Sequence, residues 1–396
     1  MQKKIMLTLL LCAGIVNAKT ECKTTEAFPV WLQKFKAEAI QQGITPETLQ
    51  KVSSYLTFDP EVIARDGKQG VFQKPFLIFS DNMATTARRD KAIKLITTTY
   101  KEIFENIEKD FGVPAAPIAA FWALESDFGA FTGKFKILSA VTTLAYDCRR
   151  ADMFRRQAFS AIKLVQRGDI QPEEMIGNWA GELGGTQFMS ADYLESGVDY
   201  DKDGKVNLVK SVPDTLASAG NFLMKKGWRR GEPWMHEVKV PEKMNWAEAD
   251  LKIKYPVSKW LQWGVKPIGA TLKDQNLMAS LLLPMGRFGP AFLVYDNFRA
   301  FLGWNESVVY SSTAAFLAAR ITGAPPMQRG SDKLNVLNAD QIKELQDQLV
   351  NQCYNVGEID GKPGPLTKSA VKQMQIKLGL PADSYPSVEL IEALKK

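Results

Sequence analysis

The apolar residues of this chain recur mostly at intervals of three and four, and they rarely alternate with polar residues. The helical spacing is clearest in residues 28–40, 92–111, 115–124 and 214–226. Side chains at this spacing share one face of an α-helix, whereas a half-buried strand requires an alternation of two. Residues 237–241 have the pattern of a short strand. The spacing therefore predicts a mainly α fold from residue 27 to about residue 320.

A stretch rich in glycine and proline follows this helical region and divides the chain. It predicts a linker at residues 323–333, because glycine and proline interrupt regular structure. The first domain then occupies residues 27–322, and residues 334–395 form a second domain near the size at which small domains become marginal alone. The second domain has two helical patterns around a glycine-rich turn, with Thr367 as the predicted N-cap of its second helix. The apolar residues of the two patterns are Ile342, Leu345, Leu349, Ala370, Val371, Met374 and Leu378.

The first eighteen residues have the organisation of a cleaved secretory signal. Two lysines precede an apolar run at residues 5–16, and residues 16–18 offer the small side chains that a signal peptidase recognises. The run is too short for a permanent membrane span, and no later stretch is long enough for one. We therefore predict a signal peptide at residues 1–18 and no transmembrane segment in the mature chain. A lipid anchor at Cys12 is disfavoured, because Leu11 stands where such a signal requires a small residue.

Histidine and cysteine are scarce, which restricts the available chemistry. His236 is the only histidine, and no Cys-x-x-Cys spacing occurs. A His-based zinc site, a Ser-His-Asp triad and a Cys-His protease are therefore nearly excluded, so that any catalysis is expected to use carboxylates. The net charge of +6 includes the two lysines of the signal. The remaining charge is too mild for a nucleic-acid-binding protein and better suits a modestly anionic polymer.

Glu125 is the carboxylate best placed for catalysis. On a helix, Ile118, Phe121, Trp122 and Glu125 share one face. Aromatic and aliphatic neighbours would desolvate the carboxyl group and raise its pKa, as a general acid requires. The alternative is a glutamate at a helix end that accepts hydrogen bonds from backbone amides. Asp127 is a poor second carboxylate, since two residues along a helix turn its side chain by about 160° from Glu125.

Residues 179–189 place three glycines close to Gln187 and Met189. Glycines permit tight turns and the close approach of a ligand. The Gln187 amide has a donor and an acceptor, which suit an N-acetyl sugar. A glycine-rich crossing of two helices would have the same composition and stays open as an alternative.

Residues 199–207 match the first half of a calcium-binding loop, with glycine at the sharp turn. Lys210 stands where the closing glutamate is expected, so a later carboxylate would have to close an enlarged loop. An acidic turn that binds no metal is an equally good interpretation. The residues that would hold calcium are Asp199, Asp201, Asp203, Lys205 through its backbone carbonyl, and Asp214.

In their order along the chain, the segments around Glu125, Gln187 and Asp199 resemble those of lytic murein transglycosylases of the B type. Residues 304–310 are similar to that family's aromatic-Asn-x-Ser-x-x-Tyr segment. The resemblance covers residues 27–320 and implies a lysozyme-like helical catalytic domain with Glu125 as the catalytic glutamate. The substrate-binding residues that it implies are Asn178, Gln187, Met189, Phe222, Arg149, Arg150, Trp304, Asn305, Ser307 and Tyr310.

The chain departs from the family's pattern at a few of these positions. Trp304 and Phe222 stand where the family can have tyrosines, and Asn178 stands where it can have a serine. The cleft would stay aromatic, but individual hydrogen bonds from the missing hydroxyls are lost. Lys205 and the long spacing to Asp214 weaken the match to a calcium loop.

Residues 334–395 resemble the small helical peptidoglycan-binding domain of many cell-wall enzymes. The similarity rests on the pattern Asp360-Gly361-x-x-Gly364-x-x-Thr367-x-x-Ala370-Val371-x-x-x-Gln375. It implies that this domain tethers the enzyme to the wall. Binding of another protein is the alternative.

The two resemblances together imply a monomeric periplasmic enzyme that acts on the glycan strands of peptidoglycan and requires no cofactor, with calcium only as a structural ion. Glu125 would act first as acid and then as base, and the products would end in 1,6-anhydromuramic acid. A lysozyme-like hydrolase and a wall-binding scaffold without turnover are the rivals.

Three cysteines remain after removal of the signal, namely Cys22, Cys148 and Cys353. An odd number allows one disulfide and a free thiol, or no disulfide. Cys22–Cys148 is the preferred pair, because both residues belong to the expected catalytic region.

Overall fold

The computed structural model describes residues 24–67, 74–269 and 272–395. The predicted signal peptide lies outside these residues. Cys22 lies outside them as well, so the predicted Cys22–Cys148 disulfide stays a prediction. Cys148 and Cys353 are each disulfide-bonded. No helix within the described ranges is both long and apolar enough to cross a bilayer.

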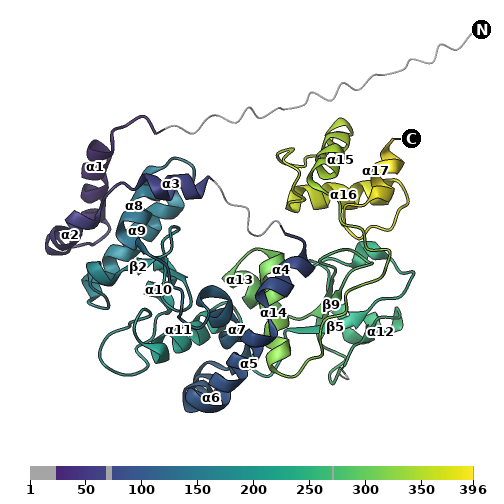
Figure 1. Ribbon diagram of the computed structural model, residues 1–396, viewed down its shortest axis with the longest axis horizontal. Helices are drawn as coiled ribbons and strands as arrows, with labels where there is room; N and C mark the ends of the chain where they lie inside the picture. Colours follow the sequence, from purple (N-terminus) through teal and green to yellow (C-terminus); the bar gives the residue numbers. More distant parts are fainter. Residues whose placement is uncertain (1–23, 68–73, 270–271, 396) are drawn as a thin grey trace, which may run out of the picture. The chain divides into compact units, whose positions relative to one another are not determined.

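The described residues form two compact units, whose helices and some of whose strands are labelled in Figure 1. The larger unit comprises residues 24–244 and 249–331, and the smaller one comprises residues 332–395 with the segment Asn245–Glu248. Residues 323–331, most of the predicted linker, are held on the larger unit. The Gln328 amide donates to Glu237 Oε1 at 2.7 Å, and the Ser331 amide donates to the Phe288 carbonyl at 2.8 Å.

Helices dominate the larger unit, as predicted. Several begin with a proline in the first turn, where its missing N–H costs nothing, or behind a side chain that caps a free amide. The helices are α1 (Phe28–Gln41), α2 (Pro46–Val52), α3 (Pro60–Asp66), α4 (Phe76–Met83), α5 (Thr86–Lys94), α6 (Lys101–Phe111), α7 (Ala115–Ser126), α8 (Ile137–Tyr146), α9 (Ala151–Arg167), α10 (Ser190–Ser196), α11 (Val212–Lys225), α12 (Val257–Gln262), α13 (Phe298–Trp304) and α14 (Val308–Ile321). Short helical turns lie at η1 (Ser53–Tyr55), η3 (Leu95–Thr99) and η4 (Pro172–Glu174), while η5 (Trp246–Glu248) belongs to the smaller unit.

The prediction of a single helix at residues 92–111 is wrong. The structure divides it into α5, the π-helical turn η3 and α6. The Thr97 and Thr98 hydroxyls donate to the carbonyls of Ile93 and Lys94, at 2.8 and 2.6 Å. Such bonds compete with the helical ladder, so a run of threonines can loosen a helix that its apolar spacing alone would continue.

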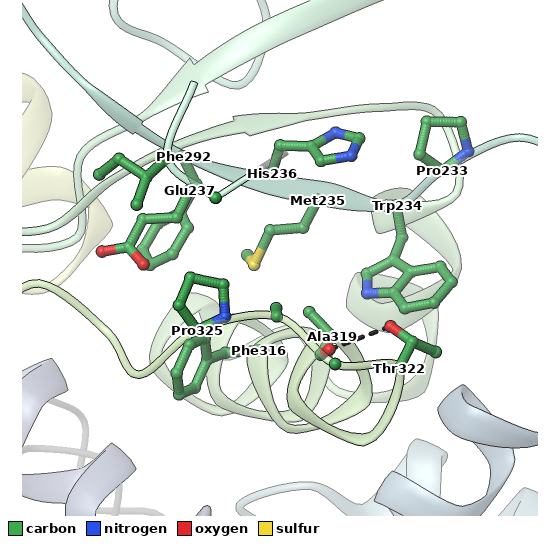
Figure 2. Close-up of a pocket in the computed structure, with 14 residues that line it drawn as sticks. Pro233, Trp234, Met235, His236, Glu237, Phe292, Phe316, Ala319, Thr322 and Pro325 are labelled. Atoms are coloured by element: carbon green, nitrogen blue, oxygen red, sulfur yellow. Dashed lines mark hydrogen bonds between the residues drawn. The ribbon is translucent and has the colours of Figure 1, made fainter. Parts of the chain in front are cut away.

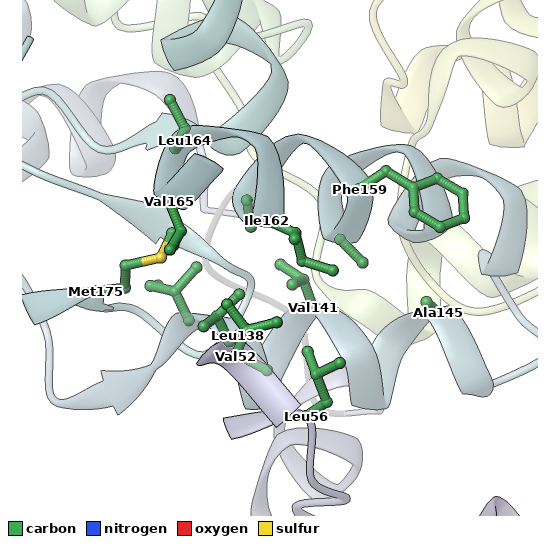
Figure 3. Close-up of a cluster of buried hydrophobic side chains, with 14 of the residues drawn as sticks. Val52, Leu56, Leu138, Val141, Ala145, Phe159, Ile162, Leu164, Val165 and Met175 are labelled. Atoms are coloured by element: carbon green, nitrogen blue, oxygen red, sulfur yellow. The ribbon is translucent and has the colours of Figure 1, made fainter. Parts of the chain in front are cut away.

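One core of the larger unit lies between α8, α9 and the N-terminal helices (Figure 3). Leu138, Val141 and Ala145 of α8 face Ile162 and its neighbours on α9, and almost no surface of these side chains is exposed. Burial of each of the larger side chains, Leu138, Val141 and Ile162, contributes about 1.5–3 kcal/mol. This packing fixes the α8–α9 pair, and the N-cap of α9 is Arg150, which reaches the functional site.

Two antiparallel sheets interrupt the helices. The first is a meander of very short strands, β1 (Phe135–Lys136), β2 (Ile176–Gly177), β3 (Glu182–Leu183) and β4 (Phe188–Met189). The second has the order β6-β8-β9-β5-β7, with β5 (Met235–Lys239), β6 (Tyr255–Pro256), β7 (Lys266–Pro267), β8 (Met278–Leu282) and β9 (Ala291–Val294). Of these strands the sequence predicted β5 alone. All four residues of β9 and the last four of β8 are buried, so neither strand alternates apolar with polar residues.

The smaller unit consists of α15 (Ala339–Asn351), α16 (Pro365–Lys377) and α17 (Val388–Leu394) around its own core. The predicted apolar residues are buried in this core, except Leu378, which is exposed. Thr367 is not the N-cap of α16, because Gly364 holds that position. The Thr367 hydroxyl is buried instead and donates to the Val356 carbonyl at 3.0 Å. A threonine three residues inside a helix therefore ties the preceding loop to it.

Candidate active site

Glu125 lies in the last turn of α7. Every residue of this helix from Ala116 to Leu124 is buried, so it has no single apolar face and is enclosed on all sides. Glu125 is half-buried and opens into a cavity of about 830 Å³. The cavity is lined by Glu61, Ala64, Arg65, Glu125, Arg150, Asn178, Trp179, Ala180, Glu182, Gln187, Phe188, Met189, Asp192, Phe222, Trp304, Asn305 and Tyr310.

Two side chains from the far end of the larger unit's sequence donate hydrogen bonds to Glu125. Trp304 Nε1 lies 2.9 Å from Glu125 Oε1, and the Tyr310 hydroxyl donates to the same oxygen. Phe121 stacks on Trp304 with ring centroids 4.0 Å apart, which fixes the plane of the indole. The Ser307 hydroxyl caps α14 at the Tyr310 amide, so the cap also positions the Tyr310 side chain.

The environment of Glu125 favours its protonated form. Burial in the cavity wall raises the pKa of Glu125 to about 8, and the nearby Glu182 carboxylate contributes to the rise. The hydrogen bonds from Tyr310 and Trp304 stabilise the ionised form and oppose the rise. Glu125 therefore keeps its proton at neutral pH, although two donors are in place to stabilise the carboxylate once the proton has left.

The glycine-rich segment forms the opposite part of the site and belongs to the small meander. Gln187 has a left-handed backbone with φ 48°, which is unusual for a residue with a side chain. Its Nε2 donates to the carbonyls of Thr132 and Gly184, at 3.1 and 2.9 Å. The group through which Gln187 can bind a ligand is therefore its Oε1 acceptor.

Asn178 and Glu182 form a second polar group beside this loop. Asn178 Oδ1 accepts hydrogen bonds from the amides of Ala180 and Glu182, at 2.8 and 3.1 Å. These bonds orient the carboxamide so that its Nδ2 donates to Glu182 Oε2. Glu182 was not predicted as a site residue. The only signal was its place in the segment that the glycines and Gln187 single out.

Replacing Gly184 by alanine is expected to destabilise the fold by more than 2 kcal/mol. Its φ is 79°, and an added Cβ would lie 2.3 Å from the Leu208 carbonyl oxygen, a backbone atom with little room to move. Gly168→Ala is the matched control, because its φ is 88° but its Cβ would meet nothing within 4 Å. Chemical denaturation of both variants measures the difference, and equal losses would show that the contact with Leu208 relaxes.

The structure brings nine of the predicted site residues to the cavity and places two elsewhere. Arg149 pairs with the carboxylate of Asp66 and donates to its carbonyl at 2.8 Å, outside the cavity lining. Ser307 acts as the helix cap described above. Arg150 also pairs with Asp66, but it reaches the cavity. Asp127 ends α7 and pairs with Arg88 at 3.4 Å, so it does not accompany Glu125 into the cavity.

The predicted calcium residues lie together in one loop, except Asp214. Carboxylate oxygens of Asp199, Asp201 and Asp203 lie within 4.8 Å of one another. Asp214 does not join this group. Its carboxylate accepts backbone amides of Tyr200, Asp201 and Asn207, at 2.7, 3.3 and 2.7 Å. Asp214 therefore holds the loop in shape from the first turn of α11. The amide of Lys205 donates to Asp203 Oδ1 at 2.8 Å.

Comparisons with known proteins agree with this geometry. Residues 27–319 match the family model described as "Transglycosylase SLT domain", and residues 338–394 match one described as "Putative peptidoglycan binding domain". The membrane-bound lytic murein transglycosylase B of Escherichia coli K12 is 27% identical over 215 residues, which cover 54% of this chain and 58% of that protein. The chain thus aligns with little more than half the length of that curated relative.

Solved structures show the same fold. SltB3 from Pseudomonas aeruginosa, solved in complex with NAG-anhNAM-pentapeptide, is 32% identical with a TM-score of 0.85, over 94% of this chain and all of that one. The E. coli lytic transglycosylase Slt35, solved in complex with calcium, is 24% identical with a TM-score of 0.62, over 73% of this chain and 92% of that one. These similarities confirm the mainly α, lysozyme-like fold. The chain belongs to the transglycosylase SLT domain family.

Proposed function

We propose that this protein is a peptidoglycan lytic transglycosylase that cleaves the bond between N-acetylmuramic acid and N-acetylglucosamine without consuming water. The observation that carries the proposal is Glu125, a carboxyl group that keeps its proton at neutral pH and faces a large cavity with two donors on one of its oxygens. A general acid needs that proton, and the two donors would stabilise the carboxylate that protonation of the substrate leaves behind.

The proposed reaction has two proton transfers, both at Glu125. Glu125 first protonates the glycosidic oxygen, and the bond to C1 of the muramoyl residue breaks. The ionised Glu125 then takes the proton of the muramoyl 6-hydroxyl, whose oxygen attacks C1 and closes a 1,6-anhydro ring. Atoms balance without water, and Glu125 ends protonated as it began. The Oε1 acceptor of Gln187 and the amide of Asn305 would orient the acetamido groups.

One observation favours a second candidate, a hydrolase. Most glycosidases use two carboxyl groups, and Glu182 lines the same cavity as Glu125. A base at Glu182 could activate a water molecule, and the product would then carry a free reducing end.

Mass spectrometry of the products distinguishes the two reactions. Purified peptidoglycan is incubated with the chain lacking residues 1–18. Muropeptides that end in 1,6-anhydromuramic acid are expected, whereas products heavier by one water would identify a hydrolase. Binding to the wall without release of soluble products would instead identify a wall-binding scaffold protein that has no catalytic activity.

We further propose that residues 334–395 tether the enzyme to peptidoglycan in the periplasm, after export directed by residues 1–18. The match to a peptidoglycan-binding family model supports the tether. The separate core of the smaller unit supports a module with a role of its own.

The acidic loop has the donors that a structural calcium ion requires. Three carboxylates from alternate residues converge, and calcium prefers such oxygen ligands. We therefore propose that Asp199, Asp201 and Asp203 hold calcium, with the Lys205 carbonyl as a further ligand and Asp214 shaping the loop. The related Slt35 was solved with calcium. The proposed chemistry at Glu125 does not need the ion.

Calcium is expected to raise the melting temperature of the protein. An ion that binds only the folded state stabilises it by about 2.7 kcal/mol at a concentration 100-fold above Kd. Asp201→Asn should abolish the difference between calcium and chelator. Asp360→Asn should keep it, because Asp360 caps a turn of the smaller unit. Equal melting of the unsubstituted protein in calcium and in chelator would contradict the proposal.

A further inference from the structure

A second carboxylate faces the cavity that contains Glu125. Glu182 extends from β3, is half-buried, and is opposite Met189 in the register of β3 and β4. The Asn178 amide donates to its Oε2, and backbone amides hold Asn178 in that orientation. The mechanism above gives Glu182 no step of its own, yet its carboxylate is built into the site by a defined hydrogen bond.

The charges around the two carboxyl groups differ. Burial raises the pKa of Glu182, and the Asn178 hydrogen bond and the charge of Arg150 oppose that rise by favouring its ionised form. Glu125 receives hydrogen bonds from the neutral donors Tyr310 and Trp304, while Glu182 disfavours its ionised form. Two carboxyl groups whose surroundings differ in this way separate into one that ionises first and one that keeps its proton.

The other charged groups near the pair belong to several elements. Arg65 and Glu61 of α3 and Asp192 of α10 line the cavity. The charge of Asp192 raises the pKa of Glu182, and the charge of Arg88 of α5 lowers the pKa of Tyr310. None of these four is among the groups that shift the pKa of Glu125, whereas the Glu182 carboxylate raises that pKa through its charge.

We infer that Glu182 is a positioning residue of the proposed reaction, whose negative charge keeps the catalytic proton on Glu125. The inference rests on the proposed function and assigns it a second carboxylate that transfers no proton itself. The same charge serves the second step, because it makes the ionised Glu125 a stronger base toward the muramoyl 6-hydroxyl. The Asn178 bond keeps the Glu182 charge at a fixed place.

The test is the pH dependence of kcat/KM for release of anhydromuramoyl products. In Glu182→Gln the amide can still accept the Asn178 hydrogen bond, but the charge is gone. The alkaline limb, which reports loss of the proton from Glu125, should move to lower pH by about one unit. Above the limb, activity should then fall about tenfold. Glu182→Asp keeps the charge and should restore most of the shift.

Glu237→Gln is the matched control. Glu237 is also a half-buried glutamate whose pKa is raised by burial, to about 7, but it lines a different cavity between β5 and α14 (Figure 2). Its replacement should leave the alkaline limb unchanged. An identical shift in both variants would show a general effect of net charge and overturn the inference.

A direct titration makes the test independent of turnover and of any folding defect in a variant. In the unsubstituted full chain labelled with carboxyl-¹³C glutamate, the Glu125 signal, identified by its loss in Glu125→Gln, should show a second inflection as Glu182 titrates. A single inflection, or an unchanged limb in an active Glu182→Gln enzyme, would overturn the inference alone. A protein that yields no anhydro products would refute the proposed function, and the coupling would still be measured by the titration.

Discussion

Glutamine in place of Glu125 will lower the turnover of peptidoglycan by about a thousandfold or more. Loss of a general acid alone costs 10²–10⁴-fold, and Glu125 is proposed to act in both proton transfers. Glutamine has nearly the same shape and its carbonyl oxygen can still accept from Trp304 and Tyr310. The cavity should therefore keep its form, and the variant should still bind glycan strands. Release of soluble muropeptides, with binding to insoluble wall in parallel, measures the two properties separately.

Asp127→Asn is the matched control for this prediction. It removes a carboxylate two residues further along, at a left-handed position that asparagine tolerates. Asp127 pairs with Arg88 and lies outside the cavity lining, so activity should stay within a few-fold of the unsubstituted protein. Near-normal turnover in Glu125→Gln would refute the assigned role of Glu125, and an equal loss in both variants would point to the end of α7 as a structural element.

Local signals in the sequence predicted two of the helices that carry the site. α7 and α11 were predicted nearly to their ends, since proline in the first turn and apolar spacing act within a few residues. The strands β8 and β9 were missed because both of their faces are buried. A short run of apolar residues without alternation does not distinguish a buried strand from a buried helix.

In the candidate site too, features set by neighbouring residues were predicted, and contacts between residues far apart in the sequence were not. Residues 118–125 alone predicted a helix with aromatic and aliphatic neighbours beside Glu125, whereas its catalytic role came from the resemblance of several segments to one family. The role of Glu182 depends on its distance in space from Glu125, 57 positions away along the chain, and no local pattern contains that distance. The same applies to Arg149, which the family resemblance placed at the substrate. Its partner Asp66 comes from α3, an element that was not predicted to meet it.

Phenylalanine in place of Tyr310 will lower kcat by about ten- to a hundredfold and move the alkaline limb of activity to higher pH. The Tyr310 hydroxyl donates to Glu125 Oε1, and burial beside Glu125 raises its own pKa far above the working range, so it remains a donor. Without it the carboxylate that forms in the first step loses one of two stabilising donors. The pKa of Glu125 should therefore rise above about 8, because a bond that lowered it is gone.

The direction of this shift separates the hydrogen bond from the charge of Glu182. A general loosening of the cavity would hydrate Glu125 and move its pKa down, as removal of the Glu182 charge would, whereas loss of the Tyr310 hydroxyl alone moves it up. Tyr295→Phe is the matched control, because the buried Tyr295 hydroxyl contacts His236 Nδ1 at 2.9 Å. Tyr295 is not among the residues that line the Glu125 cavity. The control should keep both kcat and the alkaline limb. A downward shift in Tyr310→Phe would mean that the ring holds the cavity closed and that its hydroxyl contributes little to the ionised state of Glu125.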